Sequence, residues 1–224
     1  MKKDPSTIPF DVASSDPGIV AFQTIYSPNG ILIEVGKNFA DDKIIPIALK
    51  IDKLDSVGSN IKTGEWKKLN EWPVRNPRRS RRNIRRKQAR LRTKIGNMVN
   101  DLHWRTINIL TENFKEIIVS RFEVKNMVER KGRNINNKAV RKMLGLSHGA
   151  FKKKLLIRGG QRGNHVTVTD ESYTSKTCGR CGDENEVAGR IFKCKKCKLV
   201  AGRDTIGARN IMIRTFTKEK KGKE

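Results

Sequence analysis

Residues 171–211 decide the fold of this chain: they contain ESYTSKTCGRCG at 171–182, CKKC at 194–197 and RDTIGARNI at 203–211. All four cysteines of the chain lie here, as two Cys-x-x-Cys pairs on either side of residues 182–193. Each tight turn directs two sulfurs to one centre, with backbone freedom supplied at Gly179 and Gly182, and four thiolates complete the tetrahedral shell of Zn²⁺. The pattern predicts a structural zinc ribbon whose ligands are Cys178, Cys181, Cys194 and Cys197.

A redox pair or a disulfide framework is the alternative interpretation of these cysteines. The N-terminal residues show no signal peptide and the Cys-x-x-Cys turns are rich in lysine, so we expect a soluble, intracellular protein in which thiols stay reduced. Four sulfurs leave no open position on the metal, so the zinc is expected to hold structure and to perform no chemistry.

Charge identifies the class of partner. The 224 residues carry a formal net charge of +26 and a pI of about 10.3, which predicts a polyanionic partner, most economically DNA or RNA. No apolar run approaches the roughly 18 to 20 residues that span a bilayer, so a membrane is not the expected partner. Aromatic residues make up only 6% of the chain, so contacts to phosphates rather than base stacking must dominate.

Apolar periodicity predicts alternating strands and helices, which is typical of an α/β sheet domain. A turn at Ser27–Gly30 makes the second and third strands a hairpin. One helix capped by Asn136 or Asn137 is expected to carry Val140, Met143, Leu144, Phe151 and Leu155 on a single face. The last helix is expected to bury Ala208, Ile211, Met212 and Phe216. The expected strands are 10–15, 21–26, 31–35, 116–122 and 166–168, and the other expected helices are 44–57 and about 77–112.

The long helix at about 77–112 begins with a run of basic residues that contains no acid. Like charges four residues apart, such as Arg78 and Arg82, each cost an isolated helix about 0.2–0.5 kcal/mol. A phosphate backbone along the helix converts that repulsion into attraction, whereas the alternative is a solvated face. The residues expected to bind nucleic acid are Arg78, Arg79, Arg81, Arg82, Arg85, Arg86 and Arg90.

Three carboxylates lie at the ends of apolar elements: Asp16 after the first strand, Glu123 after a later strand and Asp204 at the start of the last helix. Converging carboxylates repel each other unless a divalent cation neutralises them, and two Mg²⁺ held in this way can drive phosphodiester cleavage. For any one of these acids, a capping or surface role is the alternative.

Several blocks resemble the TnpB and Fanzor family of transposon-encoded, RNA-guided DNA nucleases. They are ESYTSKTCGRCG and RDTIGARNI above all, with DPGIVAFQTIYSPNG at 16–30, FEVKNM at 122–127 and NNKAVRKMLGLSHGAF at 136–151. The resemblance implies an RNase H-like, RuvC-type mixed sheet flanked by helices, with an inserted zinc ribbon. It also implies catalytic Mg²⁺ or Mn²⁺ at Asp16, Glu123 and Asp204, structural zinc, and DNA and guide RNA as partners.

The resemblance divides the chain into a disordered lead (1–9), a nuclease core (10–174), a zinc ribbon (175–202), a final helix (203–216) and a basic tail (217–224). Family members carry a sizeable recognition region before the first acid, which has no counterpart here, so we expect only the C-terminal part of such a nuclease. The segment 154–165 also departs from the family pattern.

Three functions remain in view. The favoured one is a metal-dependent DNA endonuclease module associated with transposition and recombination. A catalytically silent nucleic-acid-binding remnant is the second, and a ribosome-associated ribbon protein, which would not need Asp16 or Glu123, is the third. His103, His148 and His165 are expected to be packing or surface residues.

Overall fold

The structure is a computed structural model that describes residues 8–63, 77–129, 135–169, 176–186 and 189–221. Its elements, in chain order, are β1 (Phe10–Pro17), β2 (Gln23–Tyr26), β3 (Leu32–Val35), the π-helix η2 (Ala40–Ile44), α1 (Ile45–Thr63), α2 (Pro77–Asn113), β4 (Phe114–Ser120), α3 (Val124–Val128), α4 (Asn137–Leu146), α5 (His148–Arg162), β5 (His165–Thr169), β6 (Ile191–Lys193), β7 (Val200–Gly202) and α6 (Arg203–Lys221). Most of the predicted lead lies outside the described residues, although Ile8 is buried. Helix α6 continues to Lys221, into the predicted basic tail.

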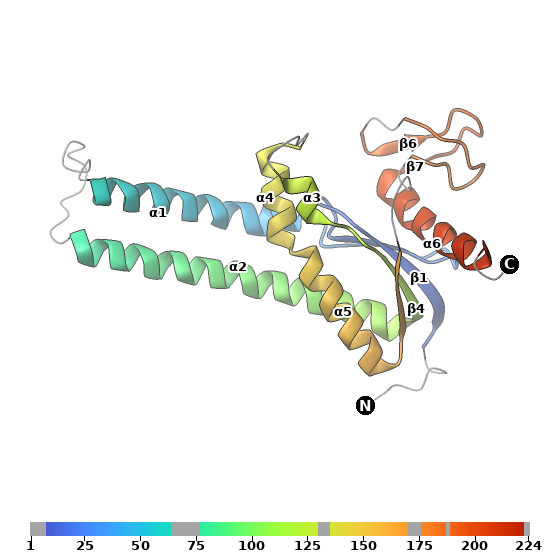
Figure 1. Ribbon diagram of the computed structural model, residues 1–224, viewed down its shortest axis with the longest axis horizontal. Helices are drawn as coiled ribbons and strands as arrows, with labels where there is room; N and C mark the ends of the chain where they lie inside the picture. Colours follow the sequence, from blue (N-terminus) through green and yellow to red (C-terminus); the bar gives the residue numbers. More distant parts are fainter. Residues whose placement is uncertain (1–7, 64–76, 130–134, 170–175, 187–188, 222–224) are drawn as a thin grey trace.

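Five strands form one mixed sheet in the order β3-β2-β1-β4-β5 (Figure 1). Strands β1 to β3 are antiparallel neighbours, whereas β4 and β5 run parallel to β1. Ser15 lies opposite Val119, so the carboxyl ends of β1 and β4 meet at one edge of the sheet. This edge, with Asp16 on β1 and Glu123 three residues after the end of β4, is called the acidic edge below. The mixed sheet flanked by helices that the sequence predicted is confirmed.

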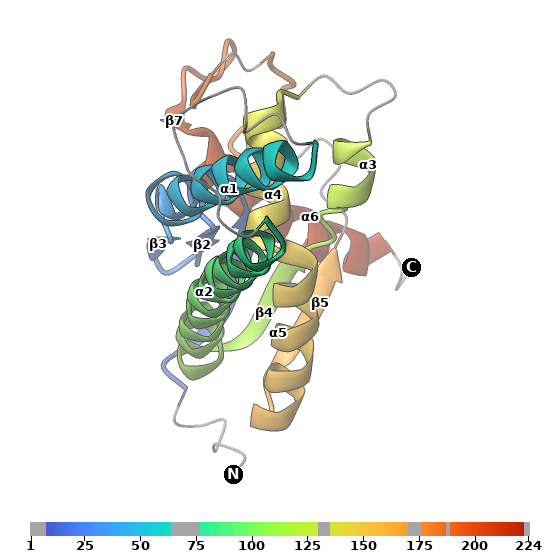
Figure 2. The ribbon, with the colours of Figure 1, turned by 90° about the vertical axis from the view of Figure 1, so that its left-hand side faces the viewer.

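Alternation along the strands separates the two faces of the sheet. Ala13, Ile117 and Val119 point into the main core, where they pack with buried residues of α2 and α5 such as Leu110 and Phe151. On the opposite face, Ile118 packs against Ile211 and Met212 of α6. Figures 1 and 2 show α6 separated from α2 and α5 by the sheet, and next to β6 and β7.

Helix α1 and the first half of α2 form an arm that extends away from the sheet (Figure 1). The two helices contact each other along the arm: Gln88 donates a hydrogen bond to Asp55 Oδ1 over 2.6 Å, and Arg92 lies 3.9 Å from Asp55 Oδ2. The second half of α2 lies against the sheet, where Ile107 and Leu110 are fully buried. Within the described residues, none of the helices has the length and apolar character needed to cross a bilayer.

Local signals explain most of the element boundaries. The hairpin turn is confirmed, because Gly30 N donates to Ser27 O and Ser27 N donates to Ile31 O, and Gly30 takes the positive φ of 85° that glycine tolerates. Asn136 caps α4 by accepting a hydrogen bond from Ala139 N over 2.8 Å.

Three expectations about helices were wrong. Leu144, expected on the apolar face of the helix after Asn136, is 56% exposed, whereas Met143 beside it is buried. The single helix after Asn136 is split into α4 and α5, because Ser147 adopts the left-handed conformation at φ 52° and turns the chain between them. In α6, Phe216 is 38% exposed, whereas Ala208, Ile211 and Met212 are buried as predicted.

Candidate metal centres and nucleic-acid interface

The four cysteines come together at one point. All four Sγ atoms lie within 4.8 Å of one another, with Cys178 Sγ 3.5 Å from Cys197 Sγ and Cys181 Sγ 3.6 Å from Cys194 Sγ. Sulfurs held about 2.3 Å from a tetrahedral ion lie roughly 3.8 Å apart, so the spacing and the donor set fit Zn²⁺. The predicted cluster could therefore hold zinc.

Each pair of cysteines lies on a turn of the same design. Cys178 N donates to Asp183 O and Gly182 N donates to Cys178 O, while Cys194 N and Lys198 N make the matching bonds with Leu199 O and Cys194 O. Gly182 has a positive φ of 75°, as its predicted role requires. Gly179 has no positive φ; its missing side chain instead makes room for Asn210, whose Oδ1 would lie 2.6 Å from an added Cβ.

Hydrogen bonds favour the thiolate form of Cys194. The backbone amide of Cys197 donates to Cys194 Sγ over 3.4 Å and lowers the pKa of that thiol below its usual range. The side chain of Asn185 donates to the same sulfur over 3.7 Å and accepts from Lys195 N over 2.8 Å. Asn185 is buried, and the sequence analysis did not identify it; nothing in its local pattern distinguishes it from a turn residue.

Two of the three predicted acids belong to neighbouring elements. Asp16 is half-buried near the end of β1, and Asp204 is half-buried in the first turn of α6. One turn further along α6, Gly207 lies so close to Asp16 that an added Cβ would be 2.4 Å from Asp16 Oδ2. Ser14, two residues before Asp16, donates to Ala208 O over 2.7 Å and fixes the strand against the helix.

Glu123 lies at the same edge of the sheet but on a separate segment. It is exposed and immediately precedes α3, a short helix that the sequence analysis did not predict. Phe122, before it, has a φ of 28°, and its ring packs edge-on against that of His148 at 5.0 Å.

The three acids are not drawn together as tightly as the cysteines. Among the described residues, the four cysteines are the one group of three or more metal-binding side chains close enough to share an ion. The structure thus brings Asp16 against the helix that carries Asp204, with Glu123 at the same sheet edge, and leaves the three carboxylates outside common coordinating distance.

The predicted basic run lies on the arm. Arg81 is partly buried and the other predicted arginines are exposed, while the α1-facing side of the helix makes the contacts with Asp55 described above. The exposed arginines of the run are Arg78, Arg79, Arg82, Arg85, Arg86 and Arg90.

Two of the three histidines are core residues. His103 and His148 stack on Phe22 with ring centroids 5.1 Å away in each case, and both are at least 96% buried. Burial lowers the pKa of His148 to about 4 and also lowers that of His103. His165 is exposed on β5.

Comparison with known proteins finds a matching family model and similar viral proteins. The family model described as "Cas12f1-like, TNB domain" matches residues 148–211, which include the four cysteines and Asp204. A putative transposase of Acanthamoeba polyphaga mimivirus is 30% identical over 199 residues, 88% of this chain and 38% of the relative. A TnpB-like protein of the same virus is 26% identical over 205 residues, 88% of this chain and 36% of the relative.

A solved structure described as a Cas12f1-sgRNA-target DNA complex covers 94% of this chain and 50% of its own, with a TM-score of 0.54 and 17% sequence identity. This likeness confirms the predicted RuvC-type, RNase H-like fold. The chain spans well under two thirds of the length of these proteins.

Proposed function

Because this chain is a homologue of the TnpB-like proteins, we propose that it is a metal-dependent DNA endonuclease module of a transposon-encoded, guided nuclease of the TnpB and Fanzor type. One observation carries the proposal: Asp16 lies against α6 within one turn of Asp204, at the sheet edge that also bears Glu123. Metal-dependent phosphodiester hydrolysis uses carboxylates as ligands for its metal ions, at a position that the phosphate backbone can reach.

Asp16, Glu123 and Asp204 are proposed to hold Mg²⁺ or Mn²⁺, since carboxylate oxygens suit these hard cations. A pair of such ions, when bound, supplies an activated water and stabilises the leaving oxygen. The residues around the acids set their positions: the hydrogen bond from Ser14 to Ala208 fixes β1 on α6, and Gly207 leaves space for the Asp16 carboxylate.

The zinc ribbon (175–202) is proposed to be structural. Four thiolates fill the tetrahedral shell, so Cys178, Cys181, Cys194 and Cys197 leave no position for substrate. The nuclease core (10–174) and the final helix (203–216) are proposed to flank the ribbon in sequence.

DNA and a guide RNA are the proposed partners. The similar Cas12f1 structure is a complex of that protein with an sgRNA and target DNA. In this chain, the exposed arginines of the arm supply the charge: Arg78, Arg79, Arg82, Arg85, Arg86 and Arg90. Guided nucleases leave sequence reading to base pairing while the protein binds the backbone, which suits a basic surface that contacts phosphates.

A second candidate is a nucleic-acid-binding protein without turnover. The observation that favours it is the separation of the three carboxylates, which, unlike the cysteines, do not lie within common coordinating distance.

Substitution of the acids separates the two candidates. The variants Asp16→Asn, Glu123→Gln and Asp204→Asn are compared singly and together. Glu34→Gln is the control, since Glu34 on β3 forms only an exposed ion pair with Lys37. Cleavage is measured on single-stranded and pre-melted DNA with Mg²⁺ or Mn²⁺. Each single substitution should abolish cleavage almost as fully as the triple substitution, because the effects of replacing residues that act as one unit are not additive. DNA binding should persist in all variants.

The same variants are also placed behind the N-terminal region of a related full-length nuclease, so that guide and target binding are provided. A wild-type chimera that folds, binds guide and target and still does not cut would refute the nuclease proposal in favour of the binding protein.

A further inference from the structure

Helix α6 lies between the two candidate metal centres and contacts each with a different side. The face of α6 that packs on the sheet is formed by residues three or four positions apart: Asp204, Gly207, Ala208 and Ile211. A second face of α6, with the same spacing, packs on the ribbon through Ile206, Asn210 and Ile213. Figure 1 shows α6 between β1 on one side and β6 and β7 on the other.

The contact with the ribbon reaches the cysteines themselves. Ile206 is 2% exposed and packs in one cluster with Cys178, Phe192 and Cys194. The zinc ligands are therefore part of the apolar surface on which the first turns of α6 rest, close to the position of Asp204.

Asn210 joins α6 to the first cysteine turn. Its side-chain amide donates to Thr177 O over 2.7 Å, directly before Cys178, and its Oδ1 approaches Gly179 so closely that an added Cβ would be 2.6 Å away. Asn210 is 6% exposed, so this is a buried contact and not a surface one. Only a glycine at position 179 permits it without displacement.

The chain itself provides a further restraint. Strand β7 ends at Gly202 and α6 begins at Arg203, with no connecting loop. Arg203 N donates to Arg190 O over 2.8 Å, one residue before β6 begins. The start of α6 is therefore directly continuous with the ribbon hairpin, and Asp204 is the second residue of the helix.

We infer that Asn210 is a positioning residue for the acidic edge, and that occupancy of the cysteine cluster by zinc strengthens binding of divalent cations at Asp16, Glu123 and Asp204. The inference rests on the proposed function, because it requires those acids to bind a cation. Coupling between two sites acts through an element that both of them bias, and α6 is that element here. By reciprocity, cation binding at the acidic edge also tightens zinc binding.

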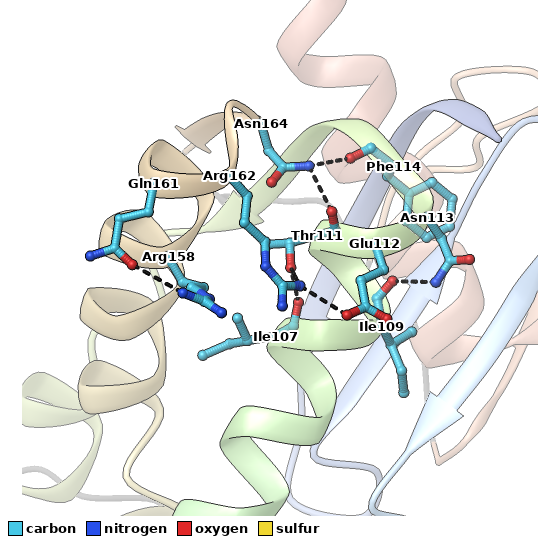
Figure 3. A network of polar contacts seen from close by, with 10 residues as sticks. All are labelled: Ile107, Ile109, Thr111, Glu112, Asn113, Phe114, Arg158, Gln161, Arg162 and Asn164. Carbon is cyan, nitrogen blue, oxygen red and sulfur yellow. Dashed lines mark hydrogen bonds and ion pairs between the residues drawn. The ribbon is translucent and has the colours of Figure 1, made fainter. Parts of the chain in front are cut away.

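The test measures Mn²⁺ binding to the whole, zinc-loaded chain by the loss of the free Mn²⁺ paramagnetic resonance signal. The primary variant is Asn210→Ala. Co²⁺ absorption of a separate, zinc-free sample of this variant verifies that its four cysteines still form a thiolate site. The matched control is Asn164→Ala. Asn164 is 7% exposed, and its amide donates to Thr111 O and Phe114 O over 3.0 and 2.7 Å, within the network of α2, β4 and α5 drawn in Figure 3.

Asn210→Ala is expected to weaken Mn²⁺ binding about fivefold or more, within the range usual for coupled sites, although the cysteine cluster still binds Co²⁺. Asn164→Ala should lower thermal stability to a similar extent, because it also removes a buried amide, and leave Mn²⁺ affinity unchanged. Wild-type chain stripped of zinc should show the same loss of Mn²⁺ affinity as Asn210→Ala, or a larger one.

Equal Mn²⁺ affinity in the wild type and Asn210→Ala would overturn the inference and leave the nuclease proposal standing. An equal loss in Asn210→Ala and Asn164→Ala would also overturn it, since general destabilisation would then explain both. Zinc-loaded wild type that binds no Mn²⁺ at the three acids would overturn the proposed function, and the inference with it.

Discussion

The carboxylate of Asp16 on β1 lies directly against Gly207 on α6, where an added Cβ would be 2.4 Å from Oδ2. Such a contact is shorter than any real Cβ makes, so one of the two residues must move if Gly207 acquires a side chain. The atom that can move is the end of the Asp16 side chain, which is the proposed metal ligand.

The Gly207→Ala variant is therefore expected to separate stability from function. Alanine improves helix propensity by about 0.8–1 kcal/mol, which offsets the displacement of Asp16, so the free energy of unfolding should change by no more than about 1 kcal/mol. Mn²⁺ binding and cleavage should fall at least about tenfold. Gly160→Ala in α5, where an added Cβ meets nothing within 4 Å, is the control and should retain function. Full Mn²⁺ affinity in Gly207→Ala would contradict a functional position for Asp16.

Zinc removal should unfold the ribbon selectively. The purified chain is expected to contain about one equivalent of zinc, and chelation should abolish amide protection at residues 176–186 and 189–202 because metal binding and folding are coupled at such sites. Amide exchange in β1 and β4 should change much less. Addition of Mg²⁺ to the stripped chain serves as the control, since thiolates do not favour it. Absence of zinc, with all four cysteines freely alkylated in the native chain, would refute the assignment.

Neutralising the arm should weaken DNA binding in a salt-dependent way. Replacing Arg78, Arg82, Arg85 and Arg86 by glutamine should flatten the slope of log affinity against log salt by up to about 3.6 units on duplex DNA, or about 2.8 on a single strand. The control replaces Lys37, Arg105 and Lys115, each of which already has an acidic partner. An unchanged slope in the arm variant would indicate a solvated face.

The buried His148 should make the chain sensitive to mild acid. Its pKa is lowered to about 4 in the folded state against 6.5 for the ordinary group, so the unfolded chain binds the extra proton between these values. The neutral imidazole contributes fully to the free energy of unfolding above pH 6.5, and this contribution is lost as the pH falls toward 4. The loss between pH 7.5 and pH 5 is about 2 kcal/mol.

The His148→Phe variant keeps a ring between Phe22 and Phe122 but cannot take up a proton. The free energy of unfolding is measured by urea titration of the zinc-loaded wild type and variant. Between pH 7.5 and pH 5 it should fall by about 2 kcal/mol more in the wild type than in the variant, because the other titrating groups are common to both. Identical pH profiles would show that His148 does not titrate in this window.

Sequence periodicity predicted the elements whose signals are local. The long helix expected at about 77–112, the turn at Ser27–Gly30 and the cap expected at Asn136 or Asn137 all depend on residues a few positions apart. Each was found, with the helix at Pro77–Asn113 and the cap at Asn136. The split at Ser147 was missed because serine has no strong preference for the left-handed conformation, and tertiary packing of α4 and α5 sets it. Phe216 continued the apolar period of α6 beyond the point where the sheet covers it.

In the candidate sites, too, the sequence predicted local features but not contacts that depend on tertiary packing. The Cys-x-x-Cys spacing predicted that four sulfurs would meet, because each pair is fixed by its own turn. The proximity of Asp16 to Gly207 and of Asn210 to Gly179 depends on how α6 docks between sheet and ribbon, which no local pattern contains. Both glycines and Asn210 lie within the quoted motifs, so their presence was visible and their contacts were not.

The position of α6 also has a consequence for biosynthesis. Asp16 lies on the first strand, but the helix that faces it follows every other described element in the chain and is the last of them to leave the ribosome. Strands β1 to β5 can pair before then, since domains begin to fold as they emerge during synthesis. The acidic edge therefore stays incomplete throughout translation of the body and the ribbon, and a nascent chain carries its basic arm long before Asp204 can join Asp16 at the proposed metal site.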